Sequence, residues 1–183
     1  NDDCGHADDA GGIYIVSDGV GSCKRAALAS KLAVESATHA LGLHPAPDPR
    51  KTLSWAIREA NRRVQEEGNR VTPRQILAAT LTVLYVLEEE FHVAHVGDSR
   101  VYLLRQERLA QITRDHSVAF DQYWQGAITK DDLRTHPNQN VLTRTLGTND
   151  FVVPDFTDGR IESGDRFLLC SDGLTKEVSD ADI

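Results

Sequence analysis

The hydrophobic positions in the first part of the chain repeat with the period of an α-helix. Apolar residues between residues 24 and 41 recur at spacings of three and four, which places them on one side of a helix. They are Leu28, Leu32, Ala29, Ala33 and Ala40. Gly42 follows, and glycine is a typical residue just after a helix C-terminus. The pattern predicts an alanine-rich amphipathic helix over residues 24–41.

A second helical pattern follows a proline-rich link at residues 44–49. Asp48 is a typical N-cap residue, and Pro49 is favoured in the first turn because it has no N–H to leave unsatisfied. One face of the following segment is apolar, and Gly68 marks its predicted end. The apolar face consists of Leu53, Ile57, Ala60 and Val64.

From residue 76 the pattern changes to that of β-strands joined by short links, which predicts an antiparallel meander. Residues 80–87 and 101–104 are apolar at nearly every position, whereas a strand with one face in water alternates. Both faces of these strands must therefore be covered. This predicts an α+β fold, a four-layer α-β-β-α sandwich of two antiparallel sheets flanked by helices. The predicted strands are residues 78–87, 91–96, 100–105 and 109–113.

Residues 117–140 interrupt the strand pattern. They predict a short helix around Phe120, and a second one that begins at the capping sequence Thr129-Lys130-Asp131-Asp132 and ends before Pro137. The insertion is polar enough to lie on the surface. The elements expected after it are a helical turn at residues 141–146, strands at residues 151–156 and 166–170, and a turn at Asp158-Gly159.

Two predicted strands end on the same sequence. Ser17-Asp18-Gly19 follows the apolar residues 12–16, and Ser171-Asp172-Gly173 follows residues 166–170. A carboxylate beside the core is costly unless a cation or hydrogen-bond donors compensate it, so the matched pair suggests a shared bound metal. Asp-Gly is also a common turn pair, and each aspartate taken alone fits that simpler alternative.

Further acids stand in comparable places. Asn1-Asp2-Asp3 lies a short, loop-like distance before the first predicted strand, and Asp98 lies in a tight bend between two strands. Mg²⁺ and Mn²⁺ take oxygen ligands from carboxylates, carbonyls and water, and Gly19 would let its carbonyl approach an ion. Two metal ions about 3.5–4 Å apart can activate a water for in-line displacement of a phosphoryl group. The acids thus predict hydrolysis that needs no nucleophilic side chain.

Composition narrows the class of protein. A formal net charge of −8 over 183 residues argues against a nucleic-acid surface, and no apolar run reaches the roughly 18 to 20 residues needed to cross a membrane. Cys4, Cys23 and Cys170 form no CxxC pattern, which favours a reducing cytoplasm over a disulfide framework. Because the chain has no methionine and opens on Asn1, we expect a single domain over residues 1–183 that is truncated at both ends.

The strand-end acids belong to a longer series of motifs that spans essentially the whole chain. The motifs are Asn1-Asp2-Asp3, Val16-Ser17-Asp18-Gly19-Val20-Gly21, Ala79-Thr80-Leu81, His95-Val96-Gly97-Asp98-Ser99-Arg100-Val101-Tyr102, Asp115-His116-Ser117 and Leu169-Cys170-Ser171-Asp172-Gly173-Leu174. In order and spacing, the series resembles the metal-dependent serine/threonine protein phosphatases of type 2C in their compact bacterial form. That family has the same α-β-β-α sandwich. The resemblance implies a catalytic domain with a flap at residues 117–140 beside the active site.

The resemblance also implies a role for each acid. Asp18 would bridge two metal ions, the Gly19 carbonyl would help to bind the first ion, and Asp172 would hold the second. Asp98 would help Asp172 to bind a third, weaker ion. The implied metal-binding residues are Asp2, Asp3, Asp18, Gly19, Asp98 and Asp172, with Asp18 and Asp172 as the catalytic pair.

Asp3 would contact metal directly or through water, and Asp2 stands where the family usually has the longer Glu. The cofactors implied are two or three Mn²⁺ or Mg²⁺ ions. The activity implied is hydrolysis of phosphoserine and phosphothreonine in phosphorylated proteins, by a water activated at a two-metal centre. A serine/threonine kinase would be the opposing partner, and neither nucleic acid nor a membrane is expected as a partner.

The sequence departs from the family's pattern in three respects. The phosphate-binding arginine that precedes the N-terminal acidic motif, and a final metal-binding aspartate on a later strand, lie outside residues 1–183. Gly21-Ser22-Cys23 replaces Gly-Gly-His, and Val20 stands where eukaryotic members carry a histidine thought to act as general acid. Two alternatives therefore stay open: a catalytically impaired pseudophosphatase that binds phosphoproteins or a regulatory partner, and a hydrolase of small phosphate esters.

Several conspicuous residues have simpler explanations. His92 and His95 look like an HxxH metal pair, but strand positions three apart face opposite sides, so core or edge histidines are expected. His116 is expected in a loop or at a helix start. Cys23 lies near a predicted helix N-terminus, where a thiol pKa can fall, and a spectator role is favoured over redox sensitivity.

Overall fold

In the described residues the fold comprises thirteen elements, and strands and helices are not segregated along the chain. The computed structural model describes residues 2–21, 25–43, 47–71, 76–180 and 182–183, so Asn1 and Cys23 of the sequence motifs lie outside the described residues. The elements are β1 (Asp3–Asp8), β2 (Ile13–Asp18), α1 (Ala26–Leu43), α2 (Pro49–Val71), β3 (Leu81–Leu87), β4 (Glu90–Val96), β5 (Arg100–Arg105), β6 (Arg108–Gln111), α3 (Val118–Trp124), the 3₁₀ helix η1 (Asp131–Arg134), β7 (Asp155–Arg160), β8 (Arg166–Cys170) and α4 (Asp172–Thr175).

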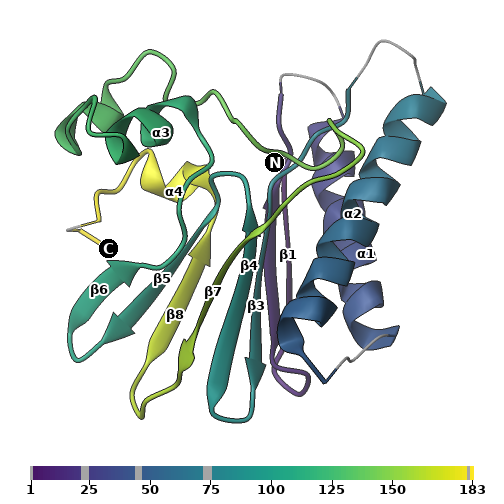
Figure 1. The fold of residues 1–183 in the computed structure, drawn as a ribbon, viewed down its shortest axis with the longest axis horizontal. Helices are drawn as coiled ribbons and strands as arrows, with labels where there is room; N and C mark the ends of the chain where they lie inside the picture. Colours follow the sequence, from purple (N-terminus) through teal and green to yellow (C-terminus); the bar gives the residue numbers. More distant parts are fainter. Residues whose placement is uncertain (1, 22–24, 44–46, 72–75, 181) are drawn as a thin grey trace.

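Two antiparallel sheets form the body of the molecule. One has the strand order β1-β2-β3-β4-β7 and the other β6-β5-β8, and helices α1 and α2 cover the outer face of the five-stranded sheet (Figure 1). The α+β class with two antiparallel sheets is confirmed. In the part of the chain described, α3, η1 and α4 lie at one end of the three-stranded sheet (Figure 1), so the continuous helical layer covers one outer face of the sandwich.

The two-sided apolar character of β3 follows from its place between two cores. Leu81 and Val83 belong to the cluster that packs against α1 and α2. Leu84 belongs to a second cluster, in which it meets Val101 and Leu103 from the other sheet. Successive side chains of a strand point to opposite faces, so a strand buried on both sides must be apolar at nearly every position. The prediction that both faces of this strand are covered is confirmed.

The helix predictions are right about faces and starts but wrong about ends. Leu53 and Ile57 are buried, and the Asp48 carboxylate accepts a hydrogen bond from the Arg50 N–H at 3.0 Å, as an N-cap does. Gly42 and Gly68 lie inside α1 and α2 rather than beyond them. Glycine is tolerated there because it weakens a packed helix by only about 1 kcal/mol.

The first strand was missed by the sequence analysis. The acids expected in a loop before the first strand lead directly into β1, and Asp3 is its first residue. β1 is an edge strand and most of its side chains are partly or fully exposed. Hydrophobic alternation, which reveals strands with one buried face, is therefore absent from it.

The predicted meander is interrupted at Gly97, because β4 and β5 belong to different sheets. Gly97 has a φ of +112°. A Cβ at Gly97 would lie 2.5 Å from the Thr80 Cγ2 atom. The chain thus crosses between sheets at a position that only glycine can occupy without strain. A short link predicts a hairpin, and here the requirement to bury both faces of β5 overrides it.

Three further local predictions were wrong. Asp158-Gly159, expected as a turn, lies inside β7. The Asp158 carboxylate binds His92 and Arg50, and a Cβ at Gly159 would meet the Phe91 ring at 2.6 Å, so the pair packs against β4. The expected strand at residues 151–156 begins only at Asp155, and residues 141–146 form no helical turn.

The insertion has the expected elements in modified form. Ser117 caps α3 by accepting a hydrogen bond from the Phe120 N–H at 3.2 Å. At the second site, the Asp132 carboxylate accepts a hydrogen bond from the Thr129 N–H at 2.8 Å, as a capping box requires. The element that follows is a 3₁₀ helix rather than an α-helix. That the insertion acts as a flap stays a prediction.

Substituting Ile57 tests the core between α2 and the five-stranded sheet. The side chain is 1% exposed and belongs to the main apolar cluster. Ile57→Ala should lower the free energy of unfolding by about 2–5 kcal/mol, because it removes buried methyl groups and leaves a cavity. Leu43→Ala, at a position 58% exposed near the end of α1, should change it by less than about 0.5 kcal/mol. Urea titrations measure both, and equal losses would contradict the assignment of this core.

Candidate active site

Strand pairing brings the predicted acids to one end of the sandwich. In the register of β1 and β2, Asp3 lies directly opposite Asp18. Asp172 follows β8 as the first residue of α4, and Asp98 lies in the crossing from β4 to β5. The Asp18 carboxylate interacts electrostatically with all three of the others. We refer to Asp3, Asp18, Asp98 and Asp172 as the acidic cluster.

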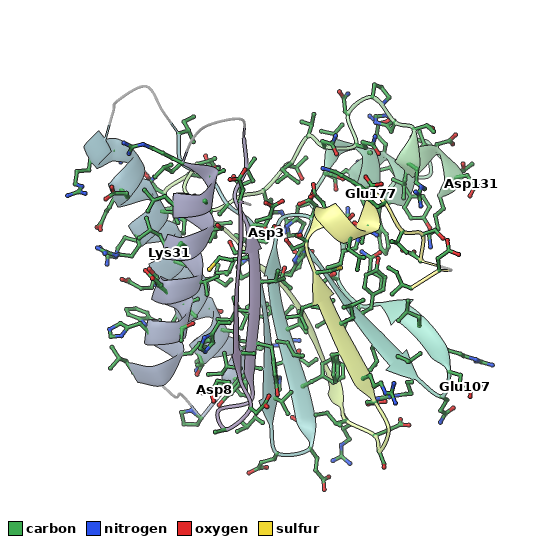
Figure 2. All side chains as sticks on the ribbon, turned by 180° about the vertical axis from the view of Figure 1, so that it is seen from behind. Asp3, Asp8, Lys31, Glu107, Asp131 and Glu177 are labelled. Carbon is green, nitrogen blue, oxygen red and sulfur yellow. The ribbon has the colours of Figure 1, made fainter. Side chains whose placement is uncertain are left out.

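The cluster belongs to one end of β1 only. Asp3 and Asp8 mark opposite ends of this strand (Figure 2), and Asp3 is at the end toward α4. Asp8 lies at the far end, where its carboxylate accepts hydrogen bonds from the N–H groups of Ala10 and Gly11 in the turn to β2. The two acids at the ends of one strand thus serve different purposes, and Asp8 is the turn residue.

Asp2 and Gly19 adjoin the cluster through their backbone atoms. The Gly19 N–H donates to the Asp2 carbonyl at 3.1 Å, while the Asp2 side chain is exposed. A Cβ at Gly19 would lie 2.1 Å from the Ala26 carbonyl oxygen. Only glycine fits against the start of α1 here, and the expectation that this helix begins close to Asp18 is confirmed.

Thr80 fixes the backbone of Asp18. The Asp18 N–H donates to the Thr80 hydroxyl oxygen at 2.8 Å, and the Thr80 N–H donates to the Asp18 carbonyl at 2.8 Å. The same hydroxyl lies 2.7 Å from the hydroxyl of Ser99. Thr80 therefore links Asp18 to Ser99, the residue that follows Asp98. The motif that contains Thr80 was recognised in the sequence, but no role was predicted for its hydroxyl.

Two acids of the cluster, Asp18 and Asp98, have raised pKa values. Burial, followed by repulsion from Asp172 and Asp3, raises the pKa of Asp18 to about 7. Burial, followed by repulsion from Asp172 and Asp115, raises the pKa of Asp98 to about 7. A divalent cation among these oxygens would remove that cost, and carboxylate oxygens are the ligands that Mg²⁺ and Mn²⁺ prefer. The chemistry of the acidic cluster therefore fits a hard divalent ion.

The side chains do not form a closed ligand shell. Across the described ranges, no three His, Cys, Asp or Glu side chains are grouped closely enough to hold a metal ion. The acidic cluster is a set of carboxylates that interact through their charges. Metal binding by the six residues singled out in the sequence therefore stays a prediction.

Lys176 supplies part of the missing positive charge. Its ammonium group forms an ion pair with Asp172, four residues earlier. It also interacts electrostatically with Asp98 and Asp18. No role was predicted for this lysine from the sequence, although its spacing of four residues from Asp172 is a signal for an ion pair on a helix.

A cavity of about 320 Å³ opens on this region. Asp98, Asp172 and Lys176 line one part of it, and Arg134 and Asn140 of the predicted flap line another. The site thus combines acids that could bind cations with basic and polar groups from a separate segment. A phosphate ester bound to metal would meet both kinds of group there.

A family model described as protein phosphatase 2C matches residues 1–182. This chain belongs to the protein phosphatase 2C family. Protein phosphatase PhpP of Streptococcus pneumoniae is 32% identical to it over 174 residues, which cover 93% of this chain and 70% of the relative. The resemblance seen in the sequence motifs is confirmed.

Solved structures agree with the family. The Mycobacterium tuberculosis serine/threonine phosphatase PstP/Ppp superimposes with a TM-score of 0.90 at 31% identity, over 100% of this chain and 76% of that one. A catalytic domain of PstP in complex with two manganese ions gives 0.87 at 30% identity, over 99% and 75%. The phosphatase MsPP from Mycobacterium smegmatis, in complex with cacodylate, gives 0.85 at 37% identity, over 96% and 73%.

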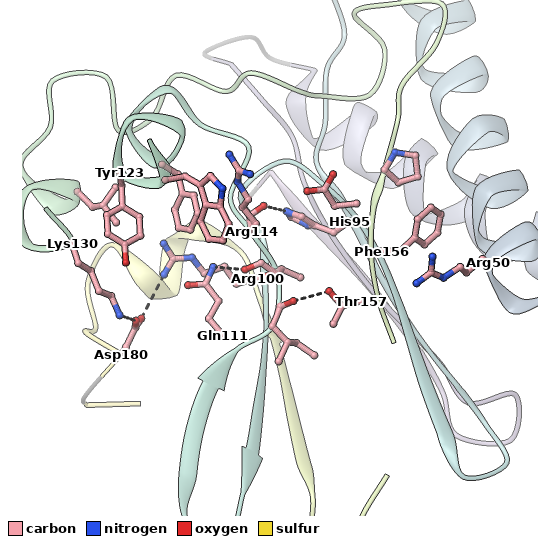
Figure 3. A pocket seen from close by; sticks show the side chains of 17 residues that line it. Arg50, His95, Arg100, Gln111, Arg114, Tyr123, Lys130, Phe156, Thr157 and Asp180 are labelled. Carbon is pink, nitrogen blue, oxygen red and sulfur yellow. Dashed lines mark hydrogen bonds and ion pairs between the residues drawn. The ribbon is translucent and has the colours of Figure 1, made fainter. Parts of the chain in front are cut away.

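In this phosphatase 2C family member a larger cavity than the one beside the acids lies elsewhere. A cavity of about 670 Å³ lies on the other side of α3 and contains no residue of the acidic cluster. Figure 3 shows Tyr123 and Arg114 above it and Phe156 at its other end. Arg114 is held there by Asp121 and by the ring of Trp124. Location beside the acids, rather than volume, identifies the candidate site.

Three histidines of the motifs and strands are structural. His92 and His95 are buried and have different partners, Asp158 for His92 and Thr82 for His95, so the expected core histidines are confirmed and the HxxH pair is not a ligand pair. The His95 ring lies 4.9 Å from that of His116. His116 directly precedes the N-cap of α3, as expected of a helix start.

The described chain contains no helix that is both long and apolar enough to cross a membrane.

His95→Gln should reduce the loss of unfolding free energy that occurs on acidification. Burial, followed by repulsion from His116, lowers the pKa of His95 from 6.5 to about 3. Between these values the unfolded state binds the extra proton. The stability contributed by neutral His95 is therefore complete above pH 6.5 and is lost on acidification, by up to about 1.4 kcal/mol per pH unit.

Urea unfolding of the wild type and His95→Gln between about pH 4 and pH 8 measures this difference. The variant should be less stable at the upper end, where it loses packing and hydrogen bonds, but should lose less on acidification. The upper end serves as an internal control because His95 is neutral there in both states. Parallel pH curves for the two proteins would contradict the prediction.

Proposed function

We propose that this protein hydrolyses phosphoserine and phosphothreonine in phosphorylated proteins, with a water activated at a centre of two divalent metal ions. The observation that carries the proposal is the acidic cluster, in which carboxylates from four separate places in the chain meet at one end of the sandwich. Membership of the phosphatase 2C family supports it, as do relatives whose names include serine/threonine phosphatase.

The ligands we propose follow from position in the cluster. Asp18 interacts with the other three acids of the cluster and would bridge the two ions, with the Gly19 carbonyl on the first ion and Asp172 on the second. Asp3, opposite Asp18 in the register, and Asp2 would add ligands to this pair. Asp98, together with Asp172, would hold a third and weaker ion. Mn²⁺ and Mg²⁺ both suit this set of oxygens.

When bound, the two ions activate a water and stabilise the in-line displacement at phosphorus. The chain's own residues orient the ligands and the ester. Thr80 holds the Asp18 backbone through two hydrogen bonds, and its carbonyl accepts a third from the Ser17 hydroxyl. Lys176 and Arg134 place positive charge on the cavity wall, where they would attract the phosphate dianion. Val20 stands where eukaryotic members of the family carry a histidine, so the proton for the leaving oxygen would come from water or from another group.

Phosphorylated proteins are the proposed partners, because the cavity beside the acids is bounded by a surface insertion rather than closed over a small molecule. An opposing serine/threonine kinase is proposed on the same grounds, since a phosphatase of this specificity needs one. We propose the cytoplasm as the location, which the cysteine content supports.

Asp18→Asn should abolish Mn²⁺-dependent hydrolysis while the fold survives. The change removes the bridging charge but keeps the size of the side chain. We expect a loss in kcat/KM larger than the roughly 10- to 100-fold typical of residues that only orient metal ligands. Activity is measured on a small aryl phosphate and on phosphoserine and phosphothreonine peptides, with Mn²⁺ and with chelator.

Asp8→Asn is the matched control. Asp8 sits at the other end of β1, and an amide oxygen can still accept the turn hydrogen bonds that Asp8 accepts. This variant should keep wild-type activity. Wild-type protein that binds Mn²⁺ and phosphopeptide without turnover would identify the pseudophosphatase instead, and turnover of metabolite esters but not of phosphopeptides would identify a small-ester hydrolase.

A further inference from the structure

His116 holds both polar backbone atoms of Gly97. The Gly97 N–H donates to the Nδ1 atom of the His116 ring at 3.1 Å, and the His116 N–H donates to the Gly97 carbonyl at 2.7 Å. The His116 side chain is 2% exposed. Gly97 directly precedes Asp98 of the acidic cluster, so the ring is one peptide unit away from a proposed metal ligand without touching its carboxylate.

The other ring nitrogen fixes the orientation of the imidazole. Because Nδ1 accepts a hydrogen bond, neutral His116 carries its proton on Nε2, which lies 3.2 Å from a carboxylate oxygen of Asp155. Arg144 donates to the second oxygen of Asp155 at 2.5 Å. The guanidinium also lies 3.1 Å from Nε2. Since both of these groups are donors, Asp155 is their common acceptor, and it holds ring and guanidinium together.

Gly97 is confined from its other side as well. Its φ is +112°, and the methyl group of Thr80 fills the space where a side chain would stand. The Thr80 hydroxyl in turn accepts the Asp18 N–H. Gly97 is therefore clamped between His116 and the residue that anchors Asp18. The direction in which the chain leaves Gly97 sets where the Asp98 carboxylate lies relative to the cluster.

We propose that His116 is a positioning residue, which places Asp98 for metal binding by holding Gly97, and that Asp155 keeps the ring in the required tautomer. The inference rests on the proposed metal-dependent function and adds a residue outside the ligand set. A direct catalytic role is not available to this ring, because both nitrogens are engaged and the side chain is buried. Residues that orient metal ligands in this way typically change metal affinity by about 10- to 100-fold when replaced.

Two substitutions at His116 test the contacts of its two ring nitrogens separately. In His116→Asn, the amide oxygen can take the place of Nδ1 and keep the bond from Gly97, but it cannot reach Asp155. In His116→Gln, the longer amide can reach Asp155 but leaves the Gly97 N–H without its acceptor. Both remove the ring and its stacking on His95, so their packing losses are similar, and only one of them keeps the hold on Gly97.

The experiment is calorimetric titration of Mn²⁺ into the wild type and the two variants, with thermal unfolding recorded in parallel. Asp98→Asn identifies the binding event that depends on Asp98. We expect His116→Gln to weaken that event by about 10- to 100-fold, and His116→Asn to stay within a small factor of wild type. In an Asp98→Asn background, His116→Gln should have no further effect on Mn²⁺ affinity.

Equal Mn²⁺ affinities in the two variants, or losses that merely follow their melting temperatures, would overturn the inference while wild-type Mn²⁺ binding upheld the proposed function. Absence of Mn²⁺ binding by the wild type would overturn the proposed function and this role of His116 with it. Asp155→Ala is a second route if a His116 variant does not fold, since its side chain is 39% exposed. It should weaken the same binding event, and unchanged affinity would count against the proposal.

Discussion

Repulsion between carboxylates at the ends of buried strands is the constraint on which this structure depends. Asp18 and Asp98 are each pushed toward the neutral form by burial and by their acidic neighbours. A fold would ordinarily avoid this cost. Here hydrogen bonds to the backbone beside each acid hold the carboxylates close together, and the Lys176 ammonium group offsets part of their repulsion. Such an arrangement is typical of a functional site rather than of one selected for stability.

The arrangement of the two sheets is what brings these acids together. For acids from β2, the β4–β5 crossing and β8 to meet, the two sheets must end at the same place, and the chain must change sheets at Gly97 without a loop. The tight crossing is possible because Gly97 has a positive φ and because Thr80 and His116 contact it from opposite sides. Support for the site therefore comes from side chains that do not belong to it.

Much of the fold was predictable because the signals were local. The buried faces of α1 and α2, the two-sided burial of β3, the N-cap at Asp48 and the strand-end positions of Asp18 and Asp172 all follow from periodicity or from the chemistry of neighbouring residues. The predictions that were wrong share a different cause. β1, the change of sheet at Gly97 and the Asp158-Gly159 pair inside β7 each depend on a partner distant in the sequence, and no local pattern reports that partner.

The sequence by itself determined the acids, their order along the chain and the family to which that order belongs. It also determined which faces of the helices and strands had to be buried, because hydrophobic periodicity records the surroundings of each segment. Only the tertiary structure decided that Asp3 pairs with Asp18, that Thr80 anchors Asp18, and that His116 stands behind Gly97 with Asp155 on its far side. Asp3 and Asp18 are 15 positions apart in the sequence, and Asp18 and Thr80 are 62 positions apart. His116 is 19 positions from Gly97 and 39 positions from Asp155. Strand register and the packing of the two sheets create these contacts, and neither can be predicted from a single segment of the sequence.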